Sequence, residues 1–491
     1  MTTRLSLATL ATISNASVPR YDRAALVPGL LHFGVGNFHR AHQAVYFDRL
    51  FNEGRDHDWA IVGAGVMPSD RLMRDRLAEQ DFLTTVVEQS ASNSTARITG
   101  AMTEMLPIGD TTAIIERLTD PAIRIVSLTV TEGGYFIDPA TGRPNRDHPA
   151  IRADAEAPDA PRTVFGLIVA GLGQRRAAGT PPFSVMSCDN ILHNGVVARE
   201  TTTGLARLVD PGLADWIEET VAFPNGMVDR ITPASGPGER ARLAADFGIE
   251  DAAPVFCEDF SQWVLEDDFP SGRPALETVG VRFVADVTPY EHMKLRILNG
   301  GHAAIAYPAG LMGIQFAHEA MAHPLVRGFL SKLEAEEIVP MVPPVPDTDL
   351  EDYLAQIEAR FANPKVGDTI ARLCFDGSNR QPKFIVPSIV DRLSAGAEVT
   401  GLALASALWC RYCYGETEQG AAIEPNDPSW DRLMLAAKTA RDDPLAWLAM
   451  EDLYGELGQA EPFRASFAKA LRSLWTVGTQ ETLSRYLKSA L

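Results

Sequence analysis

Residues 30–66 constrain the fold of this chain more than any other stretch. An apolar run at 30–33 ends on Gly34-Val-Gly36, and a pattern of helical period follows over 41–51. A second apolar run occupies 59–66 after a polar turn. Strand, glycine turn, helix and strand in this order form a βαβ unit, whose two strands lie parallel in one sheet. The sequence therefore predicts a parallel sheet close to its N-terminus.

The same alternation continues through the first 285 residues. Further β-branched runs that predict strands occupy 82–88, 123–130, 183–186 and 281–287, and amphipathic helical stretches occupy 112–118 and 163–177. Strands that alternate with helices predict an α/β fold with a Rossmann-type, doubly wound sheet. The number of strand-like runs indicates that extra strands elaborate it.

From Thr288 onward the sequence favours helices. Patterns of helical period occupy 324–335, 347–361, 387–397, 401–412, 430–440 and 467–491, and strand signals are scarce. A chain of 491 residues is also too long for one ordinary hydrophobic core. We therefore expect a dinucleotide-binding domain with extra strands over 1–285, followed by a mainly α-helical substrate-binding and catalytic domain over 286–491.

The charge and the cysteines exclude several classes of partner. With 44 basic and 64 acidic residues the formal charge is −20, which argues against binding to nucleic acid or an anionic membrane.

No apolar run reaches the ~20 residues that cross a bilayer. Residues 1–18 lack the apolar core of a signal peptide, and we expect them to form a surface arm. Five cysteines, an odd number, favour reduced thiols and a cytoplasmic location.

Cys410 and Cys413 form a Cys-x-x-Cys pair within an apolar stretch. There is no second pair and no nearby histidine, so we expect a buried helix face here instead of a metal or redox site. Since no Cys/His cluster has the spacing of metal ligands, the sequence predicts no metal.

Gly34 and Gly36 lie where a Rossmann fold binds a dinucleotide. Backbone N–H groups at the junction of a strand and a helix bind a pyrophosphate. The spacing departs from Gly-x-Gly-x-x-Gly, because His39 occupies the position of the third glycine. The location of the turn, between the first strand and its helix, nevertheless favours a dinucleotide site.

The residues after the second strand leave the choice of coenzyme open. Asp70 offers a carboxylate for the adenosine ribose, which favours NAD. Arg71 and Arg74 offer cations for a 2′-phosphate, which favours NADP. A third interpretation is structural, with Ser69 or Asp70 capping a helix that carries the two arginines.

Lys294, Asn299 and His302 carry the strongest chemical signal of the chain. At offsets of 0, +5 and +8 they lie within an arc of roughly 140° on an α-helix. A base, an amide donor and an imidazole would then project into one pocket. The helix has a readable start, with Thr288 as its N-cap and Pro289 at its first position.

Structural roles compete with functional ones at several positions. Gly300 and Gly301 could end the helix, which would undo the shared face. Lys294 could lie on an exposed helix face. The remaining structural alternatives are Glu291 in a capping box with Thr288, His302 as a core residue, Glu132 as the cap of a turn, and Asp229 as the ion-pair partner of Arg230.

Several motifs together resemble the polyol-specific long-chain dehydrogenase family, most closely its mannitol 2-dehydrogenases. They run in the family's order over nearly the whole chain, and the lysine motif is the most specific among them. The matching stretches are FGVGNFHRAH (33–42), SLTVTEGGY (127–135), SCDN (187–190), FPNGMVDRITP (223–233), EDFSQW (258–263), the Lys-x4-Asn-x2-His motif (294–302) and RLCFDGSNR (372–380). The family fold is a Rossmann-type domain followed by a mostly helical domain.

The resemblance implies a metal-independent enzyme that uses NAD, with NADP not excluded. Such an enzyme reversibly oxidises a small-molecule polyol to a ketose at a secondary alcohol, and D-mannitol and D-fructose are the favoured pair. The family's relatives make a monomer plausible. The nearest rival is a hexuronate reductase, such as a fructuronate reductase, in which Arg372 and Lys383 would hold a carboxylate. A different class of alternative is a catalytically silent sugar or nucleotide sensor on the same scaffold.

Carried over by position, the resemblance makes Lys294 the general base and puts Asn190 and Asn299 beside the reacting oxygen. Glu132 would exchange the proton with solvent. The residues implied to hold the other hydroxyls are His302, Asp229, Arg372 and, at a further lysine position, Lys383 or Arg380. The residues expected to hold the coenzyme are Gly34, Gly36, Asn37, Phe38 and Asp70. The segment after the second strand departs from the acidic pair typical of the family, which leaves the coenzyme preference open.

Elementary chemistry explains why these residue types suit the reaction. Hydride leaves an alcohol carbon readily only as the hydroxyl proton is removed, and a neutral amine can remove it. Burial can lower the pKa of a lysine from about 10.4 to about 7–8, which makes it a useful base. Preorganised amide donors stabilise a developing alkoxide by about 3 kcal/mol each.

Overall fold

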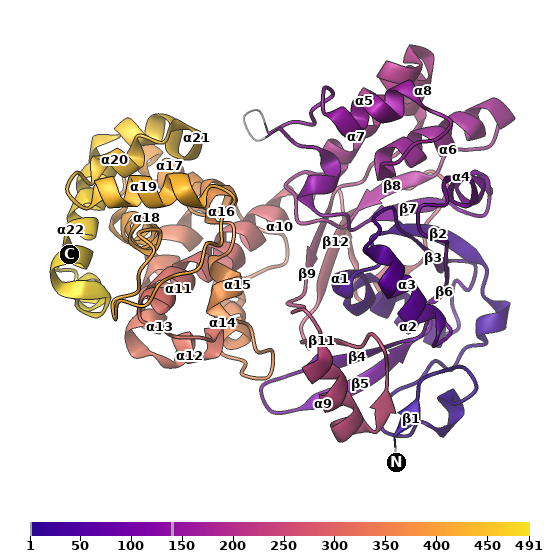
Figure 1. Ribbon diagram of the computed structural model, residues 1–491, viewed down its shortest axis with the longest axis horizontal. Coiled ribbons are helices and arrows are strands. Elements are labelled where there is room, and N and C mark those ends of the chain that lie inside the picture. Colours follow the sequence, from indigo (N-terminus) through magenta and orange to yellow (C-terminus); the bar gives the residue numbers. More distant parts are fainter. Residues whose placement is uncertain (1, 139–141) are drawn as a thin grey trace. The chain divides into compact units, whose positions relative to one another are not determined.

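A five-stranded parallel sheet organises the first part of the chain in the computed structural model, which describes residues 2–138 and 142–491. In spatial order its strands are β6 (Met102–Met105), β3 (Ala60–Ala64), β2 (Pro28–Phe33), β7 (Ile125–Leu128) and β8 (Ser184–Ser187). Every neighbouring pair is parallel. The chain builds outward from β2 through β3 and β6, and then adds β7 and β8 on the other side of β2. The predicted Rossmann-type class is therefore confirmed (Figure 1).

This strand order creates a switch point between β2 and β7. Connections leave the two strands toward opposite sides, and ligands of such sheets bind at the carboxyl ends where this happens. Phe33 at the end of β2 pairs with Leu128 at the end of β7. Gly34 and Thr129 therefore follow directly on neighbouring strands, and the Thr129 hydroxyl donates to the Gly34 carbonyl at 2.7 Å.

Helices cover both faces of this sheet. Leu31 and Phe33 of β2 belong to one apolar cluster, whereas Leu30 faces a second cluster that contains Phe47. Consecutive strand residues point to opposite faces, so β2 is buried on both sides, as parallel strands usually are. The helices of this part are α1 (Asn37–Ala41), α2 (Gln43–Asn52), α3 (Asp70–Ala78), α4 (Thr111–Thr119), α5 (Pro149–Glu156), α6 (Val164–Ala178), α7 (Asn194–Val209), α8 (Pro211–Thr220) and α9 (Pro237–Phe247).

Three small sheets contain the extra strands that the sequence predicts. One contains β11 (Val255–Glu258), β4 (Thr84–Gln89) and β5 (Ser94–Thr99), and another contains β13 (Arg282–Val284), β12 (Gln262–Glu266) and β9 (Gly226–Asp229). The third pairs β1 (Thr3–Arg4) with β10 (Ile249–Glu250).

The N-terminal segment is more than the surface arm expected for it. Thr3 and Arg4 pair with Ile249 and Glu250, and Leu5 is fully buried. A two-residue strand is too short to produce a periodic pattern, so its pairing partner far along the chain is what reveals it.

The second compact unit, Pro289–Leu491, consists of helices. The long α11 packs against α13, α15 and α18 (Figure 1). Its elements are α10 (Thr288–Met293), the π-helical turn η5 (Lys294–Asn299), α11 (Gly300–Leu311), α12 (Ala317–Ala322), α13 (Pro324–Leu333), the π-helical turn η6 (Glu334–Ile338), α14 (Leu350–Phe361), α15 (Ile370–Cys374), α16 (Gly377–Phe384), α17 (Val386–Ser394), α18 (Thr400–Tyr412), α19 (Trp430–Ala440), α20 (Leu445–Leu448), α21 (Glu451–Tyr454) and α22 (Glu461–Leu487). Cys410 lies on α18 and Cys413 follows it, both as buried thiols. Among the described helices, none is long and apolar enough to cross a membrane.

Candidate active site

The turn after β2 is shaped by its two glycines. Gly34 has a φ of 95°, and a Cβ added there would lie 2.1 Å from the Thr129 carbonyl oxygen, so no other residue fits without a backbone shift. A Cβ on Gly36 would have only the Gly34 oxygen near it, at 3.9 Å, so the outer side of the turn is open. Backbone can therefore approach a ligand closely here, which fits the phosphates of a dinucleotide.

His39, which replaces the third glycine, is a core residue. Its ring is fully buried and stacks on His32 with centroids 3.6 Å apart. His32 in turn bonds to Ser127 Oγ at 2.7 Å and Thr129 Oγ1 at 2.9 Å. Burial lowers the pKa of His32 to about 3 and lowers that of His39 well below its usual range, so both rings are neutral. A third glycine at this position would let the helix and the strand pack closely. Here the stacked rings of His32 and His39 support the turn instead.

A buried arginine fixes the first residues of α1. Arg40 donates to the Gly36 carbonyl at 3.2 Å and to Asn37 Oδ1 at 2.6 Å, and it also bonds to the Ala253 carbonyl. Phe38 stacks on His42 with centroids 4.9 Å apart. The side chains of Asn37 and Phe38 are thus engaged within the protein. Contact with a coenzyme would use their backbone.

The segment after β3 narrows the alternatives for the ribose site. Asp70 Oδ2 accepts a hydrogen bond from the Met67 N–H at 3.0 Å, and Ser69 makes no capping bond. Arg74 Nε donates to the carbonyls of Met105 and Leu106, 3.1 Å from each. Arg71 is exposed. Asp70 therefore begins α3 and its carboxylate binds the loop that follows β3, while Arg74 is bound to the end of β6.

Asp189 joins the loops that follow β7 and β8. Its carboxylate accepts from the N–H groups of Val130 at 3.0 Å and Thr131 at 2.8 Å, and from the Tyr135 hydroxyl at 2.7 Å. Burial raises the pKa of Asp189, and the nearby charge of Glu132 adds to this. Sequence reasoning missed this aspartate, although it directly precedes Asn190 in the SCDN motif.

The hydrogen bonds of the Asp189 carboxylate fix where Glu132 and Asn190 lie. Thr131 has a φ of 63°, a strained value for a β-branched residue, and it leads into a short 3-10 helix that Glu132 begins. Asn190 follows Asp189 directly. Both candidate residues have exposed side chains. Strain held by a buried carboxylate is typical of a segment whose geometry matters for function.

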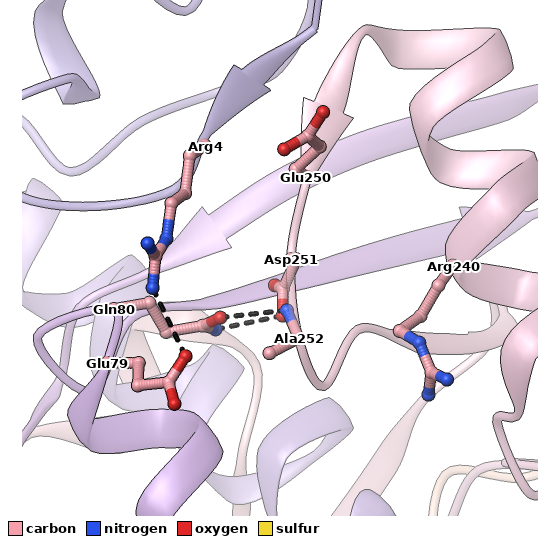
Figure 2. Close-up of a pocket in the computed structure, with 7 residues that line it drawn as sticks. All are labelled: Arg4, Glu79, Gln80, Arg240, Glu250, Asp251 and Ala252. Carbon is pink, nitrogen blue, oxygen red and sulfur yellow. Dashed lines mark hydrogen bonds and ion pairs between the residues drawn. The ribbon is translucent and has the colours of Figure 1, made fainter.

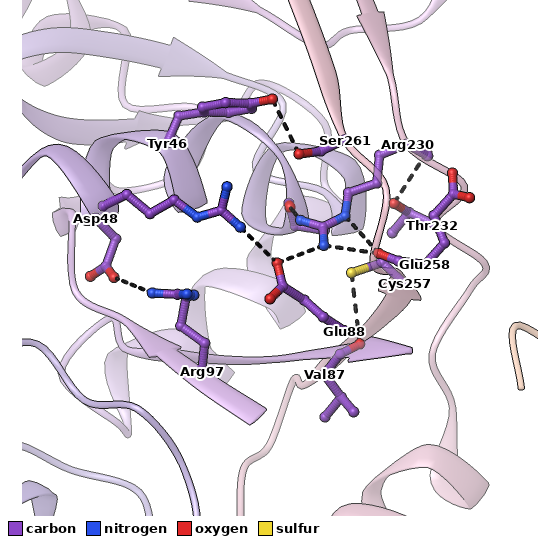
Figure 3. A network of polar contacts seen from close by, with 12 residues as sticks. Tyr46, Asp48, Val87, Glu88, Arg97, Arg230, Thr232, Cys257, Glu258 and Ser261 are labelled. Carbon is purple, nitrogen blue, oxygen red and sulfur yellow. Dashed lines mark hydrogen bonds and ion pairs between the residues drawn. The ribbon is translucent and has the colours of Figure 1, made fainter. Parts of the chain in front are cut away.

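Asp229 is the last residue of β9, opposite Gln262 of β12, and is buried. Arg230, which follows it, forms an ion pair with Glu88 at 2.7 Å (Figure 3). Arg49 contacts the same Glu88 oxygen at 3.2 Å. The side chain of Arg230 is thus committed to a partner on β4.

Lys294 begins the π-helical turn η5, and Asn299 ends it. Hydrogen bonds of a π-helix run from i to i+5, so each residue rotates less about the axis than in an α-helix. Five residues along the chain, Asn299 therefore lies closer to one full turn from Lys294. The angle between the two side chains about the helix axis is smaller than the arc of roughly 140° expected for an α-helix. Both residues are buried, with 7% and 8% of their surface exposed. Gly300 and Gly301 continue the helix into α11, so the interpretation of a helix stop is wrong.

His302, one turn further, lies among charged groups. Its ring stacks on Phe361 at 4.1 Å between centroids, and its Nε2 is 4.0 Å from Asp368 Oδ2, too far for a hydrogen bond. Arg372 holds that carboxylate with two N–H groups, one of them at 2.6 Å. Burial lowers the pKa of His302 well below its usual range, and the charges of Arg372, Arg360 and Arg380 add to this. The imidazole is therefore neutral.

Arg380 and Lys383 differ in their surroundings. Both lie on α16, where Arg380 donates to the Leu373 carbonyl at 3.3 Å and its charge acts on His302. Lys383 is exposed. Arg360, which sequence reasoning did not single out, is buried on α14 and also acts on His302.

Among the described residues, no three His, Cys, Asp or Glu side chains are grouped to hold a metal ion. A cavity of about 500 Å³ is lined by Arg4, Glu79, Gln80, Arg240, Glu250, Asp251 and Ala252 (Figure 2). None of the candidate residues lines it, so we assign it no part in the chemistry.

The chain matches two family models and several known proteins. The models described as the mannitol dehydrogenase Rossmann domain and the mannitol dehydrogenase C-terminal domain match residues 28–278 and 286–475. A mannitol 2-dehydrogenase of Cereibacter sphaeroides is 58% identical over 470 residues, which cover 96% of this chain and 98% of the relative.

Two solved structures resemble the chain over nearly its full length. The ternary complex of Pseudomonas fluorescens mannitol 2-dehydrogenase with NAD and D-mannitol has a TM-score of 0.91 and 42% identity, covering 99% of this chain and all of that one. A D-sorbitol dehydrogenase in substrate-free form has a TM-score of 0.90 and 36% identity, covering 98% of this chain and 100% of that chain.

Proposed function

This chain is an oxidoreductase that belongs to the mannitol dehydrogenase family, and from that premise we propose that it reversibly oxidises D-mannitol to D-fructose with NAD. The observation that carries the proposal is the buried Lys294 on a π-helical turn beside Asn299 and His302. A relative of 42% identity is described with NAD and D-mannitol bound, which supports this choice of coenzyme and substrate.

Lys294 is proposed as the general base. It is largely excluded from water, and burial favours the uncharged amine that can accept a proton from a hydroxyl. Asn190 and Asn299 are proposed to donate amide N–H groups to the oxygen as it gains negative charge. A neutral amide donates without competing for the proton. Glu132, exposed on its loop, is proposed to pass the proton to solvent.

The remaining hydroxyls of the polyol need donors and acceptors. Asp229 offers an acceptor, Arg372 offers donors, and the neutral His302 offers one of each. For the further cationic position we propose Arg380 over Lys383, because the charge of Arg380 acts on His302 whereas Lys383 is exposed.

The coenzyme is proposed to bind at the turn after β2. Gly34, Gly36, Asn37 and Phe38 would hold the pyrophosphate through backbone N–H groups, and Asp70 would accept a ribose hydroxyl. Bound NAD supplies the acceptor for the hydride of the alcohol. We propose a preference for NAD over NADP, because the Asp70 carboxylate would repel a 2′-phosphate and Arg74 is already bound to backbone carbonyls.

One observation favours a second candidate, reduction of a hexuronate. The charges of Arg372, Arg360 and Arg380 all act on His302, and such a set of cations suits a carboxylated sugar. The two candidates differ in the substrate that supports consumption of NADH.

Absorbance at 340 nm tests the proposal directly. Purified protein should consume NADH with D-fructose, more slowly with NADPH, and little with fructuronate. Consumption with fructuronate but not fructose would support the second candidate. Consumption with neither sugar would favour a silent sensor and contradict the proposed function.

The role of Lys294 is tested by Lys294→Ala. Loss of a general base should lower turnover by about 10²–10⁴-fold, while NADH binding, measured by fluorescence titration, stays nearly unchanged. Lys438→Ala, a change at an exposed lysine on α19, is the matched control and should retain full turnover. If Lys294→Ala kept more than about a tenth of the wild-type rate, the base would be another group.

A further inference from the structure

Arg230 buries its whole guanidinium directly after the candidate substrate residue Asp229. The side chain has 0% exposure. It donates to the Ala41 carbonyl at 2.5 Å, to Glu88 Oε1 at 2.7 Å and to the Glu258 carbonyl at 3.0 and 2.9 Å (Figure 3). These acceptors belong to three separate elements: α1, β4 and β11.

A buried cation of this kind is costly to maintain. The free-energy cost of removing a guanidinium from water is offset only when every N–H group finds an acceptor and a counter-charge is close. Glu88 supplies the counter-charge. Although burial acts to raise its pKa, Arg230 and Arg49 lower it overall, so the carboxylate stays ionised. Well-packed apolar residues would stabilise a fold as well as such a pair, so a role beyond stability is a reasonable expectation for Arg230.

The acceptors of Arg230 connect the candidate substrate residue with the candidate coenzyme turn. Ala41 is the last residue of α1, the short helix that begins after Gly36. Arg40 holds the beginning of that helix through the Gly36 carbonyl, and Arg230 holds its end. The two arginines thus secure both ends of a five-residue helix that has few hydrogen bonds of its own.

The backbone around Asp229 is secured from both sides. Asp229 pairs with Gln262 in the β-ladder. Two residues later, the Ile231 N–H donates to Glu258 Oε1 at 2.5 Å and its carbonyl accepts from the Glu258 N–H at 3.1 Å. Neighbouring side chains of an extended chain project to opposite sides, so the anchoring of Arg230 on one side determines the direction of Asp229 on the other.

We propose that Arg230 is a positioning residue for polyol binding, which acts through Asp229 and links its orientation to the coenzyme turn. This inference rests on the proposed function, because it assigns Asp229 to the substrate. Lysine cannot replace Arg230, since a single ammonium group cannot reach acceptors on α1, β4 and β11 together.

A double-mutant cycle tests the inference. Arg230→Lys and Asp229→Asn should each raise the KM for D-mannitol by about tenfold and change kcat by less than about threefold, because both remove binding that the ground and transition states share. The double variant should be no more than about twofold worse than Asp229→Asn, since residues that act through one another are not additive. Arg49→Lys, at the other partner of Glu88, should leave both constants unchanged.

A second variant guards against simple misfolding. Arg230→Met combined with Glu88→Gln removes both charges together, so no buried carboxylate is left without its partner. It should show the same rise in KM, with a thermal midpoint and an NADH titration that establish a folded protein.

The outcomes separate the inference from the proposed function. Additive effects in the cycle, or an unchanged KM in both Arg230 variants of an active enzyme, would overturn the inference alone. A wild-type chain that does not oxidise D-mannitol would overturn both.

Discussion

Glu334 offers a sharp test of the electrostatics around the helix that carries Lys294. It begins the π-helical turn η6, its carboxyl is fully buried, and neither oxygen has a hydrogen-bond partner among the described residues. One of its oxygens is 3.3 Å from the position that a Cβ on Gly301 would occupy. Burial raises the pKa of Glu334 well above its usual value of 4.5, and the charge of Glu358 adds to this. Burial therefore favours the protonated carboxyl in the folded protein.

The sign of the pH dependence follows from linkage. Below pH 4.5 the carboxyl is protonated in both the folded and the unfolded chain, so it adds no pH dependence there. Above that pH the unfolded chain releases the proton while the folded chain keeps it. The free energy of unfolding then falls by about 1.4 kcal/mol per pH unit until the folded-state pKa is reached.

Glu334→Gln removes this titration while it keeps the size of the side chain. Relative to wild type, the variant should gain about 1.4 kcal/mol of stability for each pH unit above 4.5. For a unit of this size that corresponds to about 3–6 °C in the thermal midpoint per pH unit. The measured quantity is the change of this stability difference with pH. A constant free-energy cost of burying the amide is the same at every pH and does not affect it.

Differential scanning calorimetry of the full chain between about pH 5 and pH 8 measures the effect. Glu351→Gln, at an exposed carboxyl on α14, is the matched control and should show a constant offset from wild type. A constant offset for Glu334→Gln as well would refute the reasoning, because it would mean that Glu334 is already ionised in the folded protein.

Two further predictions concern the loops of the first unit. Gly34→Ala should raise the dissociation constant for NADH at least about tenfold in a fluorescence titration, because the new Cβ would meet the Thr129 carbonyl and φ is 95°; an unchanged constant would show that this turn does not hold the coenzyme. Tyr135→Phe should cost about 1.5–3 kcal/mol of stability, because it removes a buried hydrogen bond to the Asp189 carboxylate. Chemical denaturation measures that loss, and a change below about 0.5 kcal/mol would contradict it.

Much of the fold could be read from local patterns. The strand at 30–36, the glycine turn and the strand at 59–66 appear as β2, the turn after it and β3. Helices such as α6 and α18 lie within a residue or two of their predicted ranges. A strand or helix that buries one face must repeat its apolar residues at the matching period, so the pattern is written in neighbouring residues.

Features that depend on distant partners were not visible in this way. The strand at Thr3–Arg4 needs Ile249–Glu250, and the role of Asp189 needs the loop at Val130 and Thr131. The π-helical turn at Lys294 is also absent from the sequence pattern, since α- and π-helices share the same local residue preferences. Only its hydrogen bonds in the folded chain identify it.

The same difference between local and distant interactions applies to the candidate site. Residue types and spacings alone identified a turn that fits a dinucleotide and a lysine, an asparagine and a histidine on one helix. Tertiary structure decided which charges surround His302, that Arg74 is already bound, and that Arg230 joins three elements. Periodicity and turn chemistry act between residues a few positions apart, whereas burial and electrostatics act through space between residues far apart in the chain.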